Sequence, residues 1–311
     1  MKIGLIDVDG HHFPNLALMR ISAWHKAQGD EVEWWMGDLF HYDIVYKSKV
    51  FSDAYSQDID DPMNADKVVK GGTGYAISMA DGREVYNKSA DGVLADEIER
   101  MKPDYSIYPE YDFAIAMTTR GCPRGCPFCH VVPKEGRCSH KVADVSDFYD
   151  GQKRIEILDP NITACKERFD LYDQYIETKA TITFNQGLDI RFITERDIEY
   201  ISKMKTKSLH FAWDNPKDDL KPKFEMFAQA YTKSKEHISV FCLTNFNSTL
   251  EEDLYRIYTL RDLGYYPYVM VYDKPHASKE IKRLQRWVNN RIIFKSCPRF
   301  EDYESQKGVN R

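Results

Sequence analysis

Residues 114–130 read AIAMTTRGCPRGCPFCH and join a short apolar run, a predicted strand over 114–118, to a group of cysteines. Three cysteines in the loop after this run are spaced C-x3-C-x2-C: Cys122, Cys126 and Cys129. One such loop can place three thiolates at three corners of a cubane 4Fe–4S cluster, which leaves the fourth iron open to a chelating ligand. Gly121 and Gly125 would let the loop turn tightly and bring backbone N–H groups near the sulfides. The spacing therefore predicts an iron–sulfur site.

The composition is that of an ordinary globular protein. The 311 residues include 43 Lys and Arg against 49 Asp and Glu, a formal net charge of −6, and 42% are hydrophobic. This charge balance argues against a generic nucleic-acid coat, although it is compatible with a local basic patch. No apolar run approaches the roughly 20 residues of a membrane helix, and the start of the chain turns acidic too soon for a signal peptide. We therefore expect a cytoplasmic protein that contacts no membrane and whose seven cysteines stay reduced.

The pattern of residues 1–108 predicts a small α/β domain. Predicted strands cover 2–7, 31–36, 43–46 and 67–69, and apolar residues recur at helical spacing over 16–27. Strands that alternate with helices and end in glycine-rich turns, such as Gly71-Gly72, are typical of a parallel Rossmann-like sheet.

Residues 109–311 form a second series of alternating elements. The predicted strands are 114–118, 154–158, 181–184, 208–212, 239–243 and 268–272, with a further candidate at 291–294. Helical stretches lie between most of them. This alternation predicts a partial (β/α)6 barrel, in which function is expected at the loops that follow the strands.

The C-x3-C-x2-C loop after the first barrel strand, with Phe128 before the third cysteine, resembles the signature of the radical S-adenosylmethionine (SAM) superfamily. The resemblance implies that Cys122, Cys126 and Cys129 hold a 4Fe–4S cluster whose open iron binds the amino and carboxylate groups of SAM. It also implies an external one-electron donor such as flavodoxin or ferredoxin. The electron would cleave SAM to methionine and a 5′-deoxyadenosyl radical that abstracts hydrogen from a substrate. The motif specifies neither the substrate nor the outcome of the reaction.

Polar residues after later predicted strands are candidates for cofactor contact: Asp159, Asn161, Asn185, Gln186, Asp189, Arg191, Asn245 and Asn247. By the resemblance, the turn after the second barrel strand meets the SAM amino group, and the turn after the fifth meets the adenosine. The segment 184–191 offers partners for a ribose and a cation for a carboxylate. Structural interpretations stay open beside these: a capping turn at 159–161, an ion pair between Asp189 and Arg191, and an N-cap at 248–249.

The first domain resembles the cobalamin-binding domain that precedes the barrel in one subgroup of this superfamily. The resemblance is carried by Asp9-x-His11-x-x-Pro14, Ser48 and Gly71-Gly72, with Pro14 where the subgroup's motif has glycine. Two interpretations stay open. Bound cobalamin would indicate a cobalamin-dependent radical SAM methyltransferase, whereas a degenerate Rossmann-like domain would only shape the substrate cavity.

A non-enzymatic alternative is a zinc-stabilised nucleic-acid-binding module. Zinc could use the three cysteines with His130, His140 or Cys138, although structural zinc sites usually pair cysteines that are set further apart. A predicted helix over 279–288 carries four basic residues on one face. That face could contact phosphates or simply face solvent.

Four further cysteines are too scattered to hold a second cluster: Cys138, Cys165, Cys242 and Cys297. Cys242 lies in an apolar strand and is expected in the core. Cys297 is a candidate late catalytic thiol, although nothing in the sequence indicates a lowered pKa. The sequence predicts no role for Cys165, and none for Cys138 outside the zinc alternative.

Overall fold

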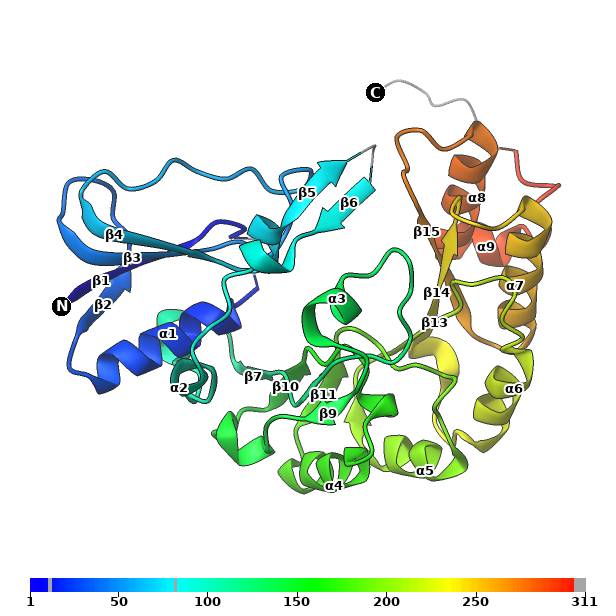
Figure 1. Cartoon of the computed structure of the whole chain (residues 1–311). Coiled ribbons are helices and arrows are strands. Elements are labelled where there is room, and N and C mark those ends of the chain that lie inside the picture. The colour runs from blue at the N-terminus through cyan, green and yellow to red at the C-terminus, as the bar shows by residue number, and fades with distance from the viewer. Residues whose placement is uncertain (11–12, 81–82, 305–311) are drawn as a thin grey trace. The chain divides into compact units, whose positions relative to one another are not determined.

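The computed structural model describes residues 1–10, 13–80 and 83–304 (Figure 1). The chain divides into two compact units, Met1–Glu156 and Ile157–Arg311. The predicted domain boundary between residues 108 and 109 lies inside the first unit and stays a prediction.

The first unit opens with a four-stranded sheet in the order β2-β1-β3-β4. Its strands are β1 (Lys2–Asp7), β2 (Glu31–Trp34), β3 (Tyr42–Ser48) and β4 (Ala65–Gly71). All three pairings are parallel, and Gly4 lies opposite Glu33 on one side and Val45 on the other. The carboxyl ends of the four strands therefore meet at one edge, which is where open α/β sheets bind ligands. The predicted parallel sheet is confirmed.

One face of this sheet packs on helix α1 (Leu16–Ala27), which joins β1 to β2 (Figure 1). Ile3 and Leu5 of β1 are buried against Leu18 of the helix. Asn15 caps the helix, because its side-chain oxygen accepts a hydrogen bond from the N–H of Leu18 at 3.2 Å. This burial of apolar side chains is the core of the sheet's helical side.

The expected alternation of strand and helix is wrong for the two connections that follow β2, from β2 to β3 and from β3 to β4. Residues 49–64 join β3 to β4 and contain no helix, although all of them are described. The segment holds four aspartates and Pro62. Aspartate and proline favour turns over a helix, since aspartate bonds its own backbone and proline lacks an N–H.

The rest of the first unit consists of short elements. They are β5 (Ile77–Ala80), β6 (Arg83–Tyr86), α2 (Asp96–Glu99), β7 (Phe113–Ala116), β8 (Thr119–Arg120), α3 (Val131–Glu135) and β9 (His140–Lys141). β5 pairs antiparallel with β6, and β8 pairs antiparallel with β9. β10 (Arg154–Ile157) crosses the division between the units. β7 and β10 confirm the strands predicted at 114–118 and 154–158, whereas the sequence did not predict the two antiparallel pairs.

The second unit alternates helices and strands. Its helices are α4 (Arg168–Thr178), α5 (Glu195–Lys203), α6 (Lys221–Ala230), α7 (Leu250–Asp262), α8 (Lys279–Asn289) and α9 (Arg291–Ser296). Its strands are β11 (Thr181–Phe184), β12 (Lys205–Thr206), β13 (Leu209–Ala212), β14 (Ile238–Thr244) and β15 (Tyr266–Val271). β13, β14 and β15 form a parallel sheet, with α6, α7 and α8 on one side of it (Figure 1). The strands predicted at 181–184, 208–212, 239–243 and 268–272 are confirmed.

One expectation about the end of the chain is wrong. Residues 291–294, a strand candidate, begin helix α9, because the Asn290 side chain accepts hydrogen bonds from the N–H groups of Ile292 and Ile293. The strand predicted at 268–272 is buried on one face only. In β15 Val269 is fully buried, but Tyr268 and Met270 are 42% and 47% exposed.

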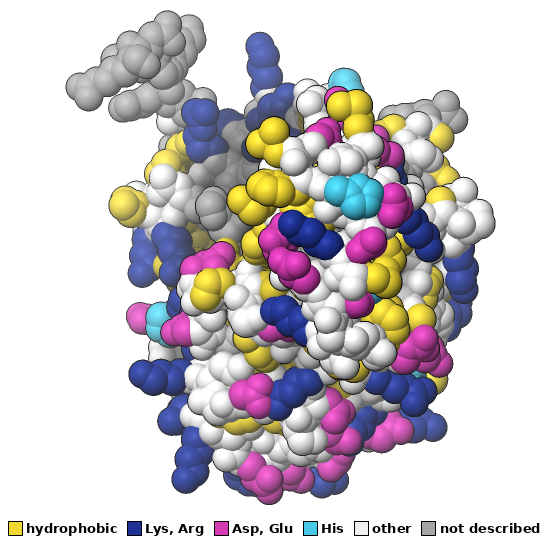
Figure 2. Space-filling view, turned by 90° about the vertical axis from the view of Figure 1, so that its left-hand side faces the viewer, with side chains coloured by type: hydrophobic (Ala, Val, Ile, Leu, Met, Phe, Trp, Pro, Cys, Tyr) yellow, Lys and Arg dark blue, Asp and Glu magenta, His cyan; other side chains and the backbone are white. Residues whose placement is uncertain are grey.

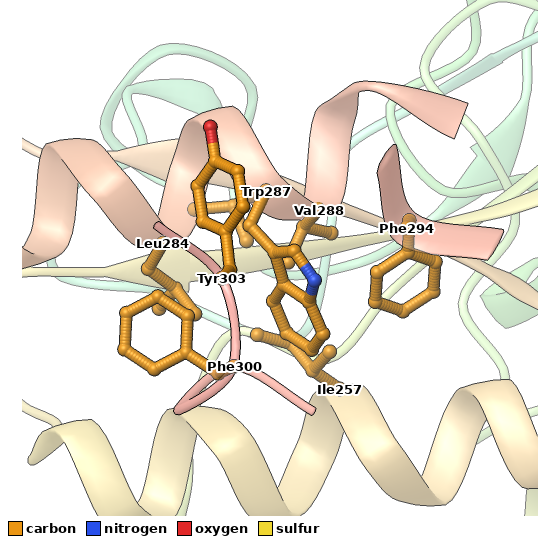
Figure 3. Close-up of a cluster of buried hydrophobic side chains, with 8 residues drawn as sticks. Ile257, Leu284, Trp287, Val288, Phe294, Phe300 and Tyr303 are labelled. Atoms are coloured by element: carbon orange, nitrogen blue, oxygen red, sulfur yellow. The ribbon is translucent and has the colours of Figure 1, made fainter. Parts of the chain in front are cut away.

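A cluster of large apolar side chains forms the core at the carboxyl end of the second unit (Figure 3). Its labelled members come from α7, α8, α9 and the segment that follows: Ile257, Leu284, Trp287, Val288, Phe294, Phe300 and Tyr303. The rings of Trp287 and Phe294 meet edge to face with their centroids 4.8 Å apart. Such pairs add to the stabilisation from burial alone.

The surface on the side that lies at the left of Figure 1 carries mixed charges. Figure 2 shows basic and acidic side chains interspersed over this face, with apolar side chains between them. None of the helices in the described part of the chain has the length and apolar character that a bilayer crossing requires.

Candidate metal centre and cofactor loops

The two ends of the loop that carries the three cysteines lie side by side, because the strands that flank the loop pair with each other. The loop lies between β8 and β9, whose pairing sets Arg120 opposite His140. The N–H of Cys122 donates to the carbonyl of Gly136 at 3.1 Å, and the N–H of Cys129 donates to the carbonyl of Cys126 at 3.0 Å. Hydrogen bonds of the backbone therefore close the base of the loop and turn its tip.

A glycine is required where the loop begins. Gly121 has φ +83°, and a Cβ on it would clash with the carbonyl oxygen of Cys138. Gly136 also has a positive φ, +89°, but a Cβ there would meet open space. Position 121 thus needs glycine for its backbone conformation, as the predicted tight turn implies, and also for close packing, which the sequence did not predict.

The three cysteines of the motif lie within eight residues of one loop. Each of Cys122, Cys126 and Cys129 is partly buried. Burial raises the pKa of the Cys129 thiol, and the thiols of Cys126 and Cys122 raise it further. This part of the increase reflects repulsion between thiolate charges. A positively charged metal group would offset the repulsion, and thiolates are the ligands that iron–sulfur clusters use. The donor set therefore fits such a cluster.

Glu135, at the end of α3, braces the start of the loop. One of its carboxylate oxygens accepts a hydrogen bond from the N–H of Gly121 at 3.0 Å, and the other accepts from Arg120 at 3.1 Å. Sequence reasoning missed this residue. It lies 14 positions from Gly121, and no local motif links the two.

Side-chain contacts connect the loop to the β5–β6 pair. His130, next to Cys129, places Nε2 3.2 Å from a carboxylate oxygen of Glu84 in β6. The other oxygen of Glu84 accepts a hydrogen bond from Ser52 at 2.6 Å. The ring of Tyr86 stacks on that of His130, with the centroids 6.1 Å apart. Zinc could bind His130 through Nδ1 while Nε2 keeps its contact with Glu84.

Three of the predicted cofactor contacts form one hydrogen-bonded group in the second unit. Asn161 donates to Asp189 at 3.3 Å, and Arg191 donates to Asp189 at 3.0 Å. Arg191 also donates twice to Asp218, at 3.0 and 2.7 Å. The side-chain oxygen of Asn161 accepts from the N–H of Ala164. Both structural interpretations, the capping turn and the Asp189–Arg191 ion pair, are therefore present, and contact with SAM stays a prediction.

The remaining candidates differ in exposure. Asp159 is buried, Asn185 is half-buried, and Gln186 and Asn247 are exposed. Asn245 adopts a left-handed conformation with φ +61°, and its side chain donates to the carbonyl of Tyr272 at 2.8 Å. A non-glycine residue in this conformation directly after a strand is uncommon and is often found at a functional site.

Helix α7, which follows Asn245, begins with a capping box. Thr249, rather than Ser248, caps the helix. Its hydroxyl accepts a hydrogen bond from the N–H of Glu252, and the Glu252 carboxylate accepts from the N–H of Thr249.

A buried ion pair lies at the carboxyl ends of β13 and β14, and sequence reasoning missed it. Arg256 and Asp253 form a salt bridge with both side chains fully buried. Arg256 also donates to the carbonyl oxygens of Trp213, Asp214 and Leu243. Burial raises the pKa of the neighbouring Asp214, whose carboxyl accepts from the N–H of Leu243. The spacing Asp253-x-x-Arg256 fits one helical turn, but nothing in the sequence showed that this turn is buried.

The residues that resemble a cobalamin motif are engaged within the chain. The Asp9 carboxylate accepts from the N–H groups of Val50 and Phe51. The Ser48 hydroxyl accepts from Asn15 at 2.8 Å. A Cβ on Gly72 would clash with the carbonyl oxygen of Lys49, so a contact of the chain itself explains that glycine. His11 lies outside the described residues.

The scattered cysteines have different environments. Cys242 is fully buried, as predicted. Cys165 is fully buried too, its thiol donates to Glu167 at 3.2 Å, and burial together with Glu167 raises its pKa to about 11. Cys138 is exposed. Cys297 is half-buried and donates to the carbonyl of Arg299, and its catalytic role stays a prediction.

The basic helix is confirmed as α8, and part of its charge is used for structure. Arg283 donates to the carbonyl oxygens of Phe300 and Tyr303, and its guanidinium lies 4.3 Å from the centroid of the Phe300 ring. Lys282 donates to the carbonyl of Pro275. Nucleic-acid binding by this helix stays a prediction.

No protein-family model matches the chain, and no curated protein matches it. A solved structure does: the radical SAM methyltransferase TsrM from Kitasatospora setae, with cobalamin and a 4Fe–4S cluster bound. The match has a TM-score of 0.63 at 12% sequence identity and covers 87% of this chain and 74% of that one. At this identity the likeness shows a shared fold. It confirms the predicted fold class, a Rossmann-like domain followed by a partial barrel.

Proposed function

We propose that this protein is a radical SAM enzyme in which Cys122, Cys126 and Cys129 hold a 4Fe–4S cluster. The observation that carries the proposal is the C-x3-C-x2-C loop, which backbone hydrogen bonds close at its base and which carries three partly buried cysteines. The fold shared with TsrM supports it, because that protein is described as a radical SAM methyltransferase with such a cluster.

The contribution of the loop residues is to position the ligands. The Gly121 backbone and the Glu135 carboxylate fix the start of the loop, while the Cys129 N–H fixes its tip. Three protein thiolates leave one iron of a cubane without a protein ligand. When bound, the cluster would supply one electron, taken from an external donor, that cleaves SAM to methionine and the 5′-deoxyadenosyl radical for hydrogen abstraction from the substrate.

The second unit would supply the SAM contacts. The guanidinium of Arg191 can pair with a carboxylate, and the carboxylate of Asp189 can accept hydrogen bonds from ribose hydroxyls. Asn245, held by Tyr272, lies on the corresponding turn after β14. The substrate and the overall reaction stay open.

Anaerobic reconstitution tests the proposal. The wild-type protein should bind about four iron and four sulfide per chain, and with dithionite and SAM it should release 5′-deoxyadenosine. Cys126→Ala should lose both properties. Cys138→Ala removes an exposed cysteine outside the motif and should keep them. One zinc per chain without iron or sulfide would overturn the proposal in favour of the zinc alternative.

A second candidate function is cobalamin-dependent methyl transfer, and one observation favours it. Residues 109–311 make up about two thirds of the chain, so a match to 87% of it extends into the first domain. The matched methyltransferase is described with cobalamin bound. Within the described residues the motif-like groups Asp9, Ser48 and Gly72 have contacts inside the chain, so these residues do not by themselves form a corrin site.

Loading with hydroxocobalamin separates the two candidates. A corrin absorbance spectrum that survives desalting, at one equivalent per chain, would support methyl transfer. Loss of the corrin on desalting would leave the radical SAM enzyme without cobalamin. The variant Asp9→Asn tests whether the charge of this motif-like aspartate contributes to corrin binding. Asparagine keeps an oxygen acceptor for the N–H of Val50, so the local backbone should stay in place.

A further inference from the structure

A cavity of about 450 Å³ opens in the first unit, and no residue of the cysteine loop lines it. Residues from three segments line it: Asp7, Gly10, Phe13, Trp34, Ile107, Tyr108, Pro109, Glu110 and Tyr111. Asp7 and Trp34 are the last residues of β1 and β2. The cavity therefore lies at the carboxyl edge of a parallel sheet, and its volume is within the usual range of small-molecule sites.

Aromatic rings form much of the wall of this cavity. Trp34 and Tyr108 meet edge to face with centroids 5.1 Å apart, and Tyr108 and Tyr111 meet at 6.1 Å. The indole of Trp34 is fixed, because its N–H donates to the carbonyl of Ile107 at 3.1 Å. Phe13, which is 40% exposed, is the fourth aromatic residue of the lining. Rings at steep angles to one another can offer their electron-rich faces to a single guest.

Two carboxylates, those of Asp7 and Glu110, belong to the lining of this cavity. Asp7 accepts a hydrogen bond from the Tyr108 hydroxyl at 2.8 Å, and Glu110 is exposed at the rim. Neither carboxylate forms a salt bridge with any residue in the described part of the chain, and the lining includes no Lys or Arg. Aromatic faces and unbalanced negative charge both favour a positively charged guest.

We propose that this cavity binds a small organic cation of the alkylammonium class, with the aromatic faces around the cation and the carboxylates of Asp7 and Glu110 beside it. A neutral planar guest would use the rings but would leave both carboxylates unbalanced. The proposal does not depend on an iron–sulfur cluster, because no cysteine lines the cavity.

Calorimetric titration of the full-length protein with choline and tetramethylammonium tests the proposal. The control ligand is 3,3-dimethyl-1-butanol, the neutral carbon isostere of choline. We expect both cations to bind and the isostere to bind at least about tenfold more weakly, since it lacks the cation–π attraction. Equal affinity for choline and its isostere would overturn the proposal, as would the absence of cation binding.

Variants locate the binding site. Glu110→Gln should weaken choline binding about two- to fivefold, and Trp34→Leu about tenfold. Because Glu110 is exposed, Glu110→Gln should fold normally. Its affinity for choline therefore tests the site even if Trp34→Leu does not fold. Glu97→Gln, an exposed acid in α2 outside the cavity, is the control and should bind like the wild type. An unchanged affinity in Glu110→Gln and Trp34→Leu would contradict the assignment.

The cluster-free variant Cys126→Ala separates this proposal from the proposed function. It should bind choline with wild-type affinity even though it binds no iron. Loss of choline binding in a folded Cys126→Ala protein would contradict the independence of the two sites.

Discussion

The cysteine loop and the carboxyl edge of the second unit are held in different ways. In the loop, backbone atoms make the defining contacts, such as the bond from the N–H of Cys122 to the carbonyl of Gly136. In the second unit, charged side chains make them, as Arg191 does between Asp189 and Asp218. A loop held by its backbone can offer its side chains to a metal. At the carboxyl edge of the second unit, by contrast, the charged side chains that a cofactor would need already bind one another.

This difference has a consequence for mutagenesis. A change of side chain in the loop should alter metal content more than stability, whereas a change at the edge should alter stability first. The exceptions are loop positions where the backbone itself is constrained, Gly121 above all.

The largest effect on stability is expected from Arg256→Met. The change leaves Asp253 as an uncompensated buried charge and removes the donor from three carbonyl oxygens. We expect a loss of about 3–5 kcal/mol in the free energy of unfolding, measured by urea denaturation. Lys203→Met, in an exposed pair with Glu199, is the control and should change stability by less than about 1 kcal/mol. Similar losses in both variants would show that the edge does not depend on this buried pair.

The next effect concerns the backbone of the loop. Both Gly121→Ala and Gly136→Ala place a side chain at positive φ, but only the first also meets a backbone carbonyl, that of Cys138. Gly121→Ala should therefore be less stable than Gly136→Ala by about 2 kcal/mol and should bind less iron on reconstitution. Equal iron content and stability in the two variants would mean that close packing at Gly121 is unimportant.

A smaller effect is expected from Arg191→Lys. Lysine can replace one of the contacts to Asp189 and Asp218 but cannot keep all of them. Stability should fall by about 1–2 kcal/mol, iron content should stay unchanged, and the KM for SAM should rise. A wild-type KM in this variant would contradict the predicted contact between Arg191 and SAM.

The smallest expected effect is a difference in thiol reactivity. At pH 8, iodoacetamide should label the exposed Cys138 long before Cys165, whose pKa is raised to about 11 by burial and Glu167. In the folded protein the pKa of Cys165 lies above its ordinary value of 9.0. The contribution of this thiol to stability is therefore complete below pH 9.0 and is lost as the pH rises toward 11. Peptide mapping by mass spectrometry measures the two rates, and comparable rates would show that Cys165 is accessible.

The parts of the fold with a strong local signal could be predicted from the sequence. β1 and β11 have the predicted bounds, since the apolar run in β1 and the alternation of threonine with Ile182 and Phe184 in β11 are both patterns of β-strands. The loop glycines were predicted to turn tightly, and Gly121 does so at positive φ. The strand predicted at 291–294 failed because the Asn290 cap and the packing of Phe294 on Trp287 outweigh an apolar run of only three residues, 292–294.

Contacts between distant segments could not be predicted. The pairing of Glu84 with His130 spans 46 positions, and the cavity at Trp34 and Tyr108 joins residues that are more than 70 positions apart. Periodicity and spacing report only on neighbours along the chain, so such contacts leave no pattern in a single sequence. The candidate cofactor residues were recognised by position after a strand, but their mutual bonds, such as Asn161 to Asp189, appear only in three dimensions.

The most direct test of the central claim compares iron, sulfide and SAM cleavage in the wild type, Cys126→Ala and Cys138→Ala after anaerobic reconstitution. The account predicts a 4Fe–4S electron paramagnetic resonance signal and 5′-deoxyadenosine in the wild type and in Cys138→Ala, with both absent in Cys126→Ala. SAM cleavage retained by Cys126→Ala, or a wild-type protein that takes up zinc and no iron, would contradict it.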